Sequence, residues 1–171
     1  MGQLVPQLQG VLFLVYTAGL MFVLRFYFSG WAHHAPIRAL LICSALTGIG
    51  LYWLGGLEPG TSPFIAFAAA TVFGVGKTYL WPTMLGVTAE QFPRGGALLI
   101  SLMGGAGMLS VAAALPIMGA EIDRFGPGAA LQIFAIPTAI LVLIFGGLLF
   151  YFNARGGYRA VQLPAGSMAG K

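Results

Sequence analysis

Long stretches without charge constrain this chain more than any other feature of its sequence. Only 8 basic and 4 acidic side chains occur in 171 residues. They separate apolar runs that are near or above the roughly 20 residues a helix needs to cross a bilayer. These runs cover residues 1–24, 39–57, 95–120 and 125–154, and residues 59–89 contain only one charge. We therefore predict an all-α polytopic membrane protein with about five transmembrane helices, over residues 6–28, 37–54, 62–89, 95–119 and 128–152.

The composition excludes several classes of protein. Hydrophobic residues make up 58% of the chain and charged residues 7%, whereas a soluble domain carries about 25% charged residues. The basic residues form no stripe interleaved with aromatics, so nucleic acid is not an expected partner. Barrel strands are also excluded, because the apolar runs are far longer than about ten residues and do not alternate. The expected solvent for this surface is the lipid bilayer.

The distribution of basic residues predicts the orientation of the chain in the membrane. The N-terminus and the second and fourth connections between predicted spans lie on one side of the membrane. They carry one basic residue, Arg124, together with Glu58, Glu121 and Asp123. The opposite side carries six basic residues: Arg25, Arg38, Arg94, Arg155, Arg159 and Lys171. Because cytoplasmic connections collect positive charge, we expect an N-terminus outside and a C-terminus in the cytoplasm, in the plasma (inner) membrane. Residues 155–171 are then a short basic cytoplasmic tail, expected to lack fixed structure.

Lys77 is the most informative single residue. It stands near the middle of the third predicted span, about 20 Å along the helix from either end. A charged group at that depth costs a few kcal/mol and usually faces a cavity or a partner. No acidic residue lies inside another predicted span. Its partner is then a carbonyl or water, a group outside this chain, or a ligand; the alternative is a lysine that extends to the interface.

The residues around Lys77 favour a binding site for a small polar solute. Hydroxyl and aromatic side chains there suit a solute that carries a ring, and the candidate binding residues are Lys77, Thr78, Tyr79 and Trp81. Residues that weaken a helix are typical of transporter sites at the membrane midplane, and here they are Gly74, Gly76 and Pro82. An aromatic packing cluster beside a lipid-facing kink is the open alternative.

Small residues gather in the fourth span. They allow another helix to approach closely, with a hinge as the second interpretation, and they are Ser101, Gly104, Gly105 and Gly107. Metal and catalytic sites are not expected. His33 and His34 belong to a connection, Cys43 lies inside a span, and the acidic residues are elsewhere. We therefore expect no cofactor, no metal and no enzymatic activity.

Two segments of the sequence resemble a known family of transporters. The run 76–86 followed by 90–96 resembles the tenth helix, and the turn after it, of major facilitator superfamily transporters. The run 116–119 followed by 123–126 resembles the exit of the eleventh helix. The family's loop signature is Gly-x-x-x-Asp-Arg-x-Gly-Arg-Arg. Gly30 and Arg38 fall in register with it, and a closer partial match lies on the predicted outer side, at Gly119, Asp123, Arg124 and Gly126.

The resemblance implies a fold and a function. The chain would correspond to helices eight to twelve of a twelve-helix fold, that is, to a partial major-facilitator-type bundle. It would be the C-terminal portion of a secondary transporter that moves a small polar solute by alternating access. The remaining transporter helices, or a membrane partner, would then complete it. The alternative from another class is a non-transporting membrane subunit or an assembly protein.

Overall fold

Helices account for every regular element in the part of the chain that the structure describes. The structure, a computed structural model, describes residues 4–58 and 60–161. Its elements are α1 (Leu4–His34), α2 (Pro36–Gly55), α3 (Pro63–Gln91), the short 3₁₀ helix η1 (Pro93–Gly95) and α4 (Gly96–Ala154). The predicted all-α class is confirmed for these residues.

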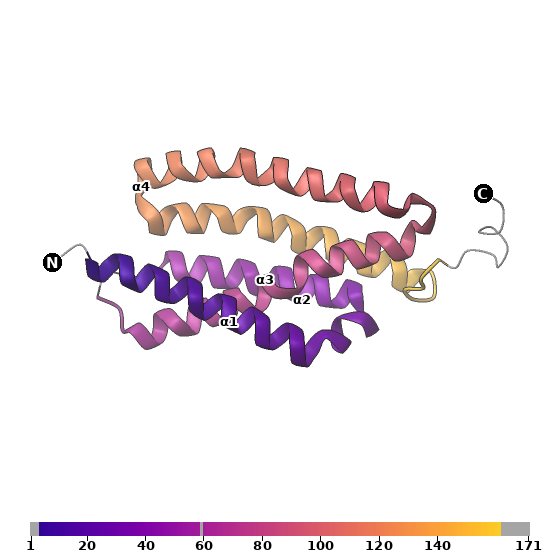
Figure 1. Cartoon of the computed structure of the whole chain (residues 1–171), viewed down its shortest axis with the longest axis horizontal. Coiled ribbons are helices and arrows are strands. Elements are labelled where there is room, and N and C mark those ends of the chain that lie inside the picture. Colours follow the sequence, from indigo (N-terminus) through magenta and orange to yellow (C-terminus); the bar gives the residue numbers. More distant parts are fainter. Residues whose placement is uncertain (1–3, 59, 162–171) are drawn as a thin grey trace.

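A break at Gly126 divides α4 into two limbs that run in opposite directions (Figure 1). Gly126 has φ 86° and ψ 165°, which is a backbone conformation that glycine adopts far more readily than residues with a Cβ. Pro127 follows and fixes the start of the returning helix. We call residues 96–125 the first limb and residues 127–154 the second limb. The two limbs correspond to the fourth and fifth predicted spans.

Three helical stretches are long and apolar enough to cross a membrane, namely Pro36–Gly55, Pro63–Gln91 and Pro93–Ala154. A shorter apolar helix covers Val11–Tyr27, within α1. These helices support a membrane location. They do not by themselves establish five separate crossings, so the count of five stays a prediction.

Glycines bring α2 close to both of its neighbours. A Cβ added at Gly50 would lie 2.5 Å from the backbone nitrogen of Phe73 in α3. One added at Gly128 in the second limb would lie 2.6 Å from the carbonyl oxygen of Gly55. Backbones that approach so closely leave no room for side chains, which is how membrane helices gain packing contacts. Small residues therefore fix the position of α2 against α3 and the second limb.

Apart from Arg25 and Lys77, the charged residues of the described chain lie toward the two ends of the bundle. Neighbouring helices α1 and α3 run in the same direction, while α2 runs in the opposite direction (Figure 1). The turn from α2 to α3 and the Gly126 break therefore lie at one end, with Glu58, Glu121, Asp123 and Arg124. The other end holds Arg38, Arg94, Arg155 and Arg159. Lys171 lies outside the described residues.

Residues 155–161 of the tail are described, and three of them bond to the end of α3, which the expectation of a tail without fixed structure did not include. The rest of that prediction concerns residues 162–171, which lie outside the described residues. The hydroxyl of Tyr158 donates a hydrogen bond of 2.7 Å to the Glu90 carboxylate. Gln91 donates through Nε2 to the Arg159 carbonyl over 2.9 Å, and the Val161 amide donates to the Glu90 carbonyl. Two glycines with positive φ, at 156 and 157, let the chain turn back toward α3, which the basic composition alone did not indicate.

Candidate functional site

Helices α1 and α3 run in the same direction and contact each other over their central parts (Figure 1). The rings of Phe13 and Phe67 stack with centroids 4.6 Å apart. The hydroxyl oxygens of Tyr16 and Thr71 lie 2.7 Å apart and share a hydrogen bond. Further along, α1 comes close enough to Gly74 that an added Cβ would lie 3.0 Å from Leu20. Of the candidate binding residues of α3, Thr78 and Tyr79 contact α1.

Pro82 opens the hydrogen-bonding pattern of α3 at the level of Thr78. Proline has no N–H, so the carbonyl four residues earlier loses its usual partner. The guanidinium of Arg25 in α1 replaces the missing donor, because its Nε and Nη2 donate to the Thr78 carbonyl over 3.3 Å and 3.2 Å. A positive side chain from one helix thus satisfies a backbone group that a proline frees in the other.

A second polar contact runs between the same two helices. The Tyr79 hydroxyl donates to the Leu24 carbonyl over 2.5 Å. Sequence reasoning placed Arg25 at a connection, yet nine more residues of α1 follow it, or about 14 Å of helix. Arg25 is therefore a site residue that the sequence analysis missed. The signals available were that Arg25 falls inside the predicted span 6–28 and that another predicted span contains a proline, Pro82.

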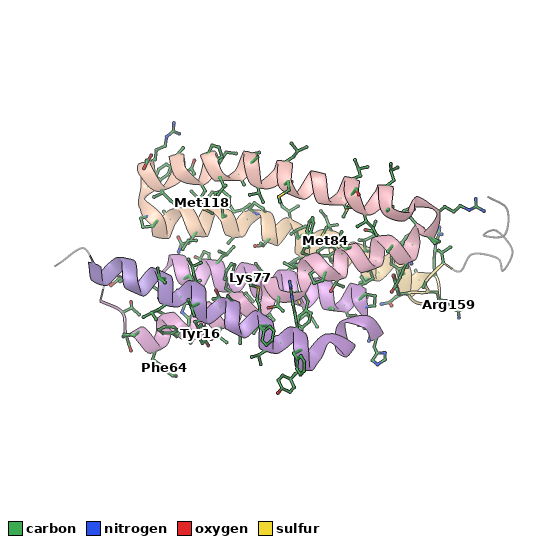
Figure 2. The ribbon with its side chains drawn as sticks, viewed as in Figure 1. Tyr16, Phe64, Lys77, Met84, Met118 and Arg159 are labelled. Carbon is green, nitrogen blue, oxygen red and sulfur yellow. The ribbon has the colours of Figure 1, made fainter. Side chains whose placement is uncertain are left out.

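Lys77 lies midway along the bundle, between Phe64 near the start of α3 and Arg159 at the opposite end (Figure 2). It is partly exposed, and its ammonium sits 5.0 Å from the centroid of the Phe73 ring. Such a cation–π contact is a modest stabilisation. Within the described part of the chain no hydrogen bond reaches the ammonium. Lys77 is thus a cation at mid-depth with an aromatic face as its neighbour.

The other candidate residues of α3 divide into buried and exposed members. Thr78 is fully buried and donates its hydroxyl to the Gly74 carbonyl over 2.6 Å. Tyr79 is also buried and uses its hydroxyl on α1. Trp81 is 42% exposed and, being four residues beyond Lys77, shares its face of the helix. Lys77 and Trp81 are the candidate side chains of this group that are at least partly exposed.

Glycines of the candidate set have two different surroundings. Gly76 crosses α2 closely, because an added Cβ would lie 2.6 Å from the Thr47 hydroxyl and 2.8 Å from the Cys43 carbonyl. Gly107 lies under Trp81, whose Cζ3 would be 2.9 Å from an added Cβ. Gly104 and Gly105 would gain no neighbour within 4 Å, and Ser101 is exposed. Among the three glycines of the predicted packing face, an added Cβ would meet another helix of the described chain at Gly107 and not at Gly104 or Gly105.

Most residues of the loop-like motif lie on the surface of the described chain. Gly30, Arg38, Asp123 and Arg124 are exposed, and nothing lies within 4 Å of a Cβ added at Gly119. Gly126 forms the break in α4. Among the described residues no group of three or more His, Cys, Asp or Glu side chains gathers to hold a metal. Cys43 is buried, His34 is exposed, and the His33 side chain lies outside the described residues.

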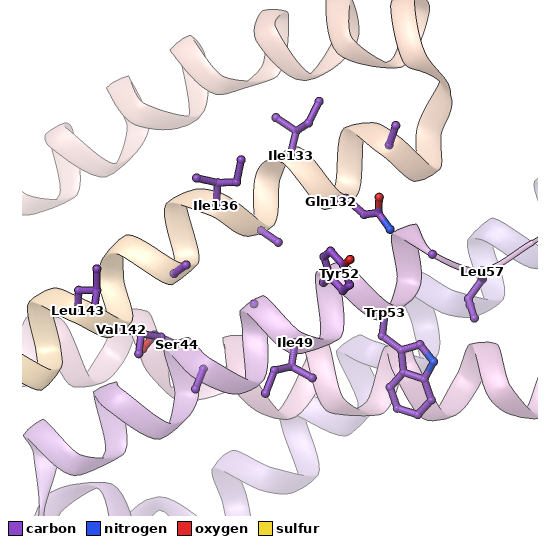
Figure 3. A pocket seen from close by; sticks show the side chains of 16 residues that line it. Ser44, Ile49, Tyr52, Trp53, Leu57, Gln132, Ile133, Ile136, Val142 and Leu143 are labelled. Atoms are coloured by element: carbon purple, nitrogen blue, oxygen red, sulfur yellow. The ribbon is translucent and has the colours of Figure 1, made fainter.

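A large apolar groove lies elsewhere, between α2 and the second limb (Figure 3). Its volume is about 1160 Å³. Ile49, Ile136 and Leu143 are among its lining, and its few polar groups include Tyr52 and Gln132. None of the residues predicted from the sequence lines it. Its chemistry is suited to a hydrocarbon chain or another helix, so the candidate solute site stays on the α1–α3 pair.

A smaller cavity of about 250 Å³ lies at the end of the bundle where basic residues gather. His34, Arg38, Asn153 and Tyr158 contribute its polar lining. Burial and the hydrogen bond to Glu90 raise the pKa of Tyr158 to about 12. The Tyr158 side chain thus joins the tail to α3 in its neutral form.

Comparison with known proteins adds no identity to this geometry. The chain matches no family model, no curated protein and no solved structure.

Proposed function

We propose that the chain is the C-terminal portion of a secondary transporter that moves a small polar solute across the plasma (inner) membrane. The observation that carries the proposal is Lys77, a partly exposed cation halfway along an apolar helix. Cations at that depth are costly, and they mark solute pathways or partners. The proline-interrupted helix around it is the second support, because transporter sites are built on such interruptions.

The wider arrangement supports the same proposal. Five helical segments, counting both limbs of α4, would cross the bilayer as five spans of a major-facilitator-type bundle. The basic end would face the cytoplasm, which gives an outside N-terminus and a cytoplasmic C-terminus. The alternating access mechanism would rock this bundle against a second one around the fixed site. The exposed face of the first limb, at Gly104 and Gly105, offers a surface for that second bundle.

Uptake measurements test the proposal directly. Cells that produce the chain together with its genomic neighbours are supplied with radiolabelled carboxylates, sugars, amino acids and nucleosides. We expect accumulation of at least one class, and Lys77→Ala removes it while the amount of protein in the membrane stays normal. Arg94→Ala is the matched control, because it removes one positive charge from an exposed turn. Uptake that is equal in the two variants contradicts the assignment of the site.

A non-transporting membrane subunit is the second candidate. The observation in its favour is again the first limb, where large apolar side chains such as Leu98 and Met108 are 81% and 75% exposed. On that reading Lys77 binds an acidic group of a partner protein. Lys77→Ala then lowers the amount of the chain in the membrane and changes no solute uptake, so the same pair of variants separates the two functions.

A further inference from the structure

We propose that the solute is an anion, with a carboxylate or a phosphate group that Arg25 and Lys77 hold between them at mid-depth in the membrane. This inference rests on the proposed transport function and narrows its substrate class. It follows from the position of two cations, from the placement of every acidic residue of the chain, and from the donors that remain open on the two side chains.

The two cations contact the central part of α3, Arg25 at the Thr78 carbonyl and the Lys77 ammonium over the Phe73 ring. Arg25 reaches the carbonyl of Thr78, and Lys77 is the residue before it. Fourteen residues of α3 precede Lys77 and fourteen follow it, since the helix runs over Pro63–Gln91. Each half is about 21 Å long at 1.5 Å per residue. Lys77 thus stands at the centre of α3, and Arg25 of α1 contacts the same central part of that helix, which is long enough to cross the bilayer.

No acidic residue of the chain can neutralise these two charges. The sequence contains four acids. Glu90 is thirteen residues beyond Lys77 in α3, about 20 Å along the helix. Glu58, Glu121 and Asp123 lie at the opposite end of the bundle. Two like charges in a medium of low dielectric constant repel each other and each lose hydration, so a bound anion improves the energy of both.

Both side chains keep donors for a ligand. A guanidinium has five N–H groups in a planar fork, and Arg25 directs only Nε and Nη2 to the Thr78 carbonyl. The remaining edge suits the two oxygens of a carboxylate or phosphate. Lys77 rests on the Phe73 ring, a contact weaker than a charged hydrogen bond. Arg25 is exposed and Lys77 is partly exposed, so an anion can approach them.

Trp81 provides both a wall for the site and a means to test it. It shares a helix face with Lys77, at a separation of about 5–6 Å between Cβ atoms. The other tryptophans, Trp31 and Trp53, are replaced by phenylalanine to leave Trp81 as the single emitter. The purified full chain in uncharged detergent is then titrated with iodide, an anionic quencher, and with acrylamide, a neutral one.

The ratio of the iodide to the acrylamide quenching constant reports the local concentration of anions. One positive charge about 8 Å from the ring raises that concentration about twofold even at the dielectric constant of water. We therefore expect Lys77→Gln and Arg25→Gln each to lower the ratio about twofold or more, and Arg94→Gln to leave it unchanged. Succinate and inorganic phosphate should protect Trp81 from iodide, whereas an uncharged sugar should not.

Several outcomes would overturn the inference. An unchanged ratio in both variants shows that no anion gathers at this site. A quenching ratio that falls for Lys77→Gln but not for Arg25→Gln shows that Arg25 binds only the Thr78 carbonyl. Acrylamide constants and circular dichroism identify a variant that fails to fold, and Arg25→Lys then tests the charge with a smaller change of shape. An unchanged ratio together with Lys77-dependent uptake removes the anion class but keeps transport, whereas the reverse pattern keeps the anion site without transport.

Discussion

Replacement of Gly76 by alanine tests whether the close crossing of α2 and α3 holds the bundle together. The added methyl group would lie 2.6 Å from the Thr47 hydroxyl and 2.8 Å from the Cys43 carbonyl. Ordinary contacts of these kinds exceed 3 Å, so the helices must separate by several tenths of an ångström. Overpacking of this kind costs about 1–3 kcal/mol.

Gly86 is the matched control, because it lies in the same helix and an added Cβ there meets nothing within 4 Å. Alanine favours a helix over glycine by about 1 kcal/mol at either position, so this gain cancels between the two variants. Unfolding in mixed micelles with increasing denaturing detergent should therefore rank Gly76→Ala about 1–3 kcal/mol below Gly86→Ala. Equal midpoints for the two variants would refute the close crossing.

Two further predictions concern polar contacts. Arg25→Leu should lower the free energy of unfolding by about 1–2 kcal/mol. The loss should be much smaller in a Pro82→Ala background, because residue 82 then has an N–H that donates to the Thr78 carbonyl. Equal losses in the two backgrounds would contradict this interpretation. Because the pKa of Tyr158 rises from an ordinary 10.0 to about 12 on folding, its stabilisation is complete below pH 10 and is lost as the pH rises toward 12. Protease cleavage of the tail should increase across that alkaline range in the wild type, while Tyr158→Phe, which lacks the bond to Glu90, should be cleaved readily at every pH.

The helices could be predicted from the sequence because their cause is local. A run of apolar residues without charge has few alternatives to a helix in lipid, and each predicted span falls on a helical segment of the structure. The turn at Gly126 was also visible, since glycine followed by proline interrupts a helix. Whether the segments cross as five separate spans depends on the membrane and not on the apolar runs alone.

The contacts of the candidate site depend on which helices pair, and a single sequence does not contain that information. Arg25 looked like a residue of the cytoplasmic connection because the charge count ignores where a long side chain reaches. Its true partner, the Thr78 carbonyl, is set by Pro82 in another helix. Thr78 likewise looked available to a solute, yet it is buried against α1 and bonds to its own helix.

The contact between Arg25 and Thr78 also has a consequence for the insertion of the protein into the membrane during translation. The two residues are separated by 53 positions, and a ribosome adds about 5–20 residues per second. About 3–10 seconds therefore pass between the synthesis of Arg25 and the synthesis of Thr78. During that time the Arg25 guanidinium lacks the Thr78 carbonyl as a partner, so the transfer of α1 from the insertion channel into lipid is unfavourable. Release of α1 should thus be delayed until α3 emerges, so that the two helices enter the bilayer together.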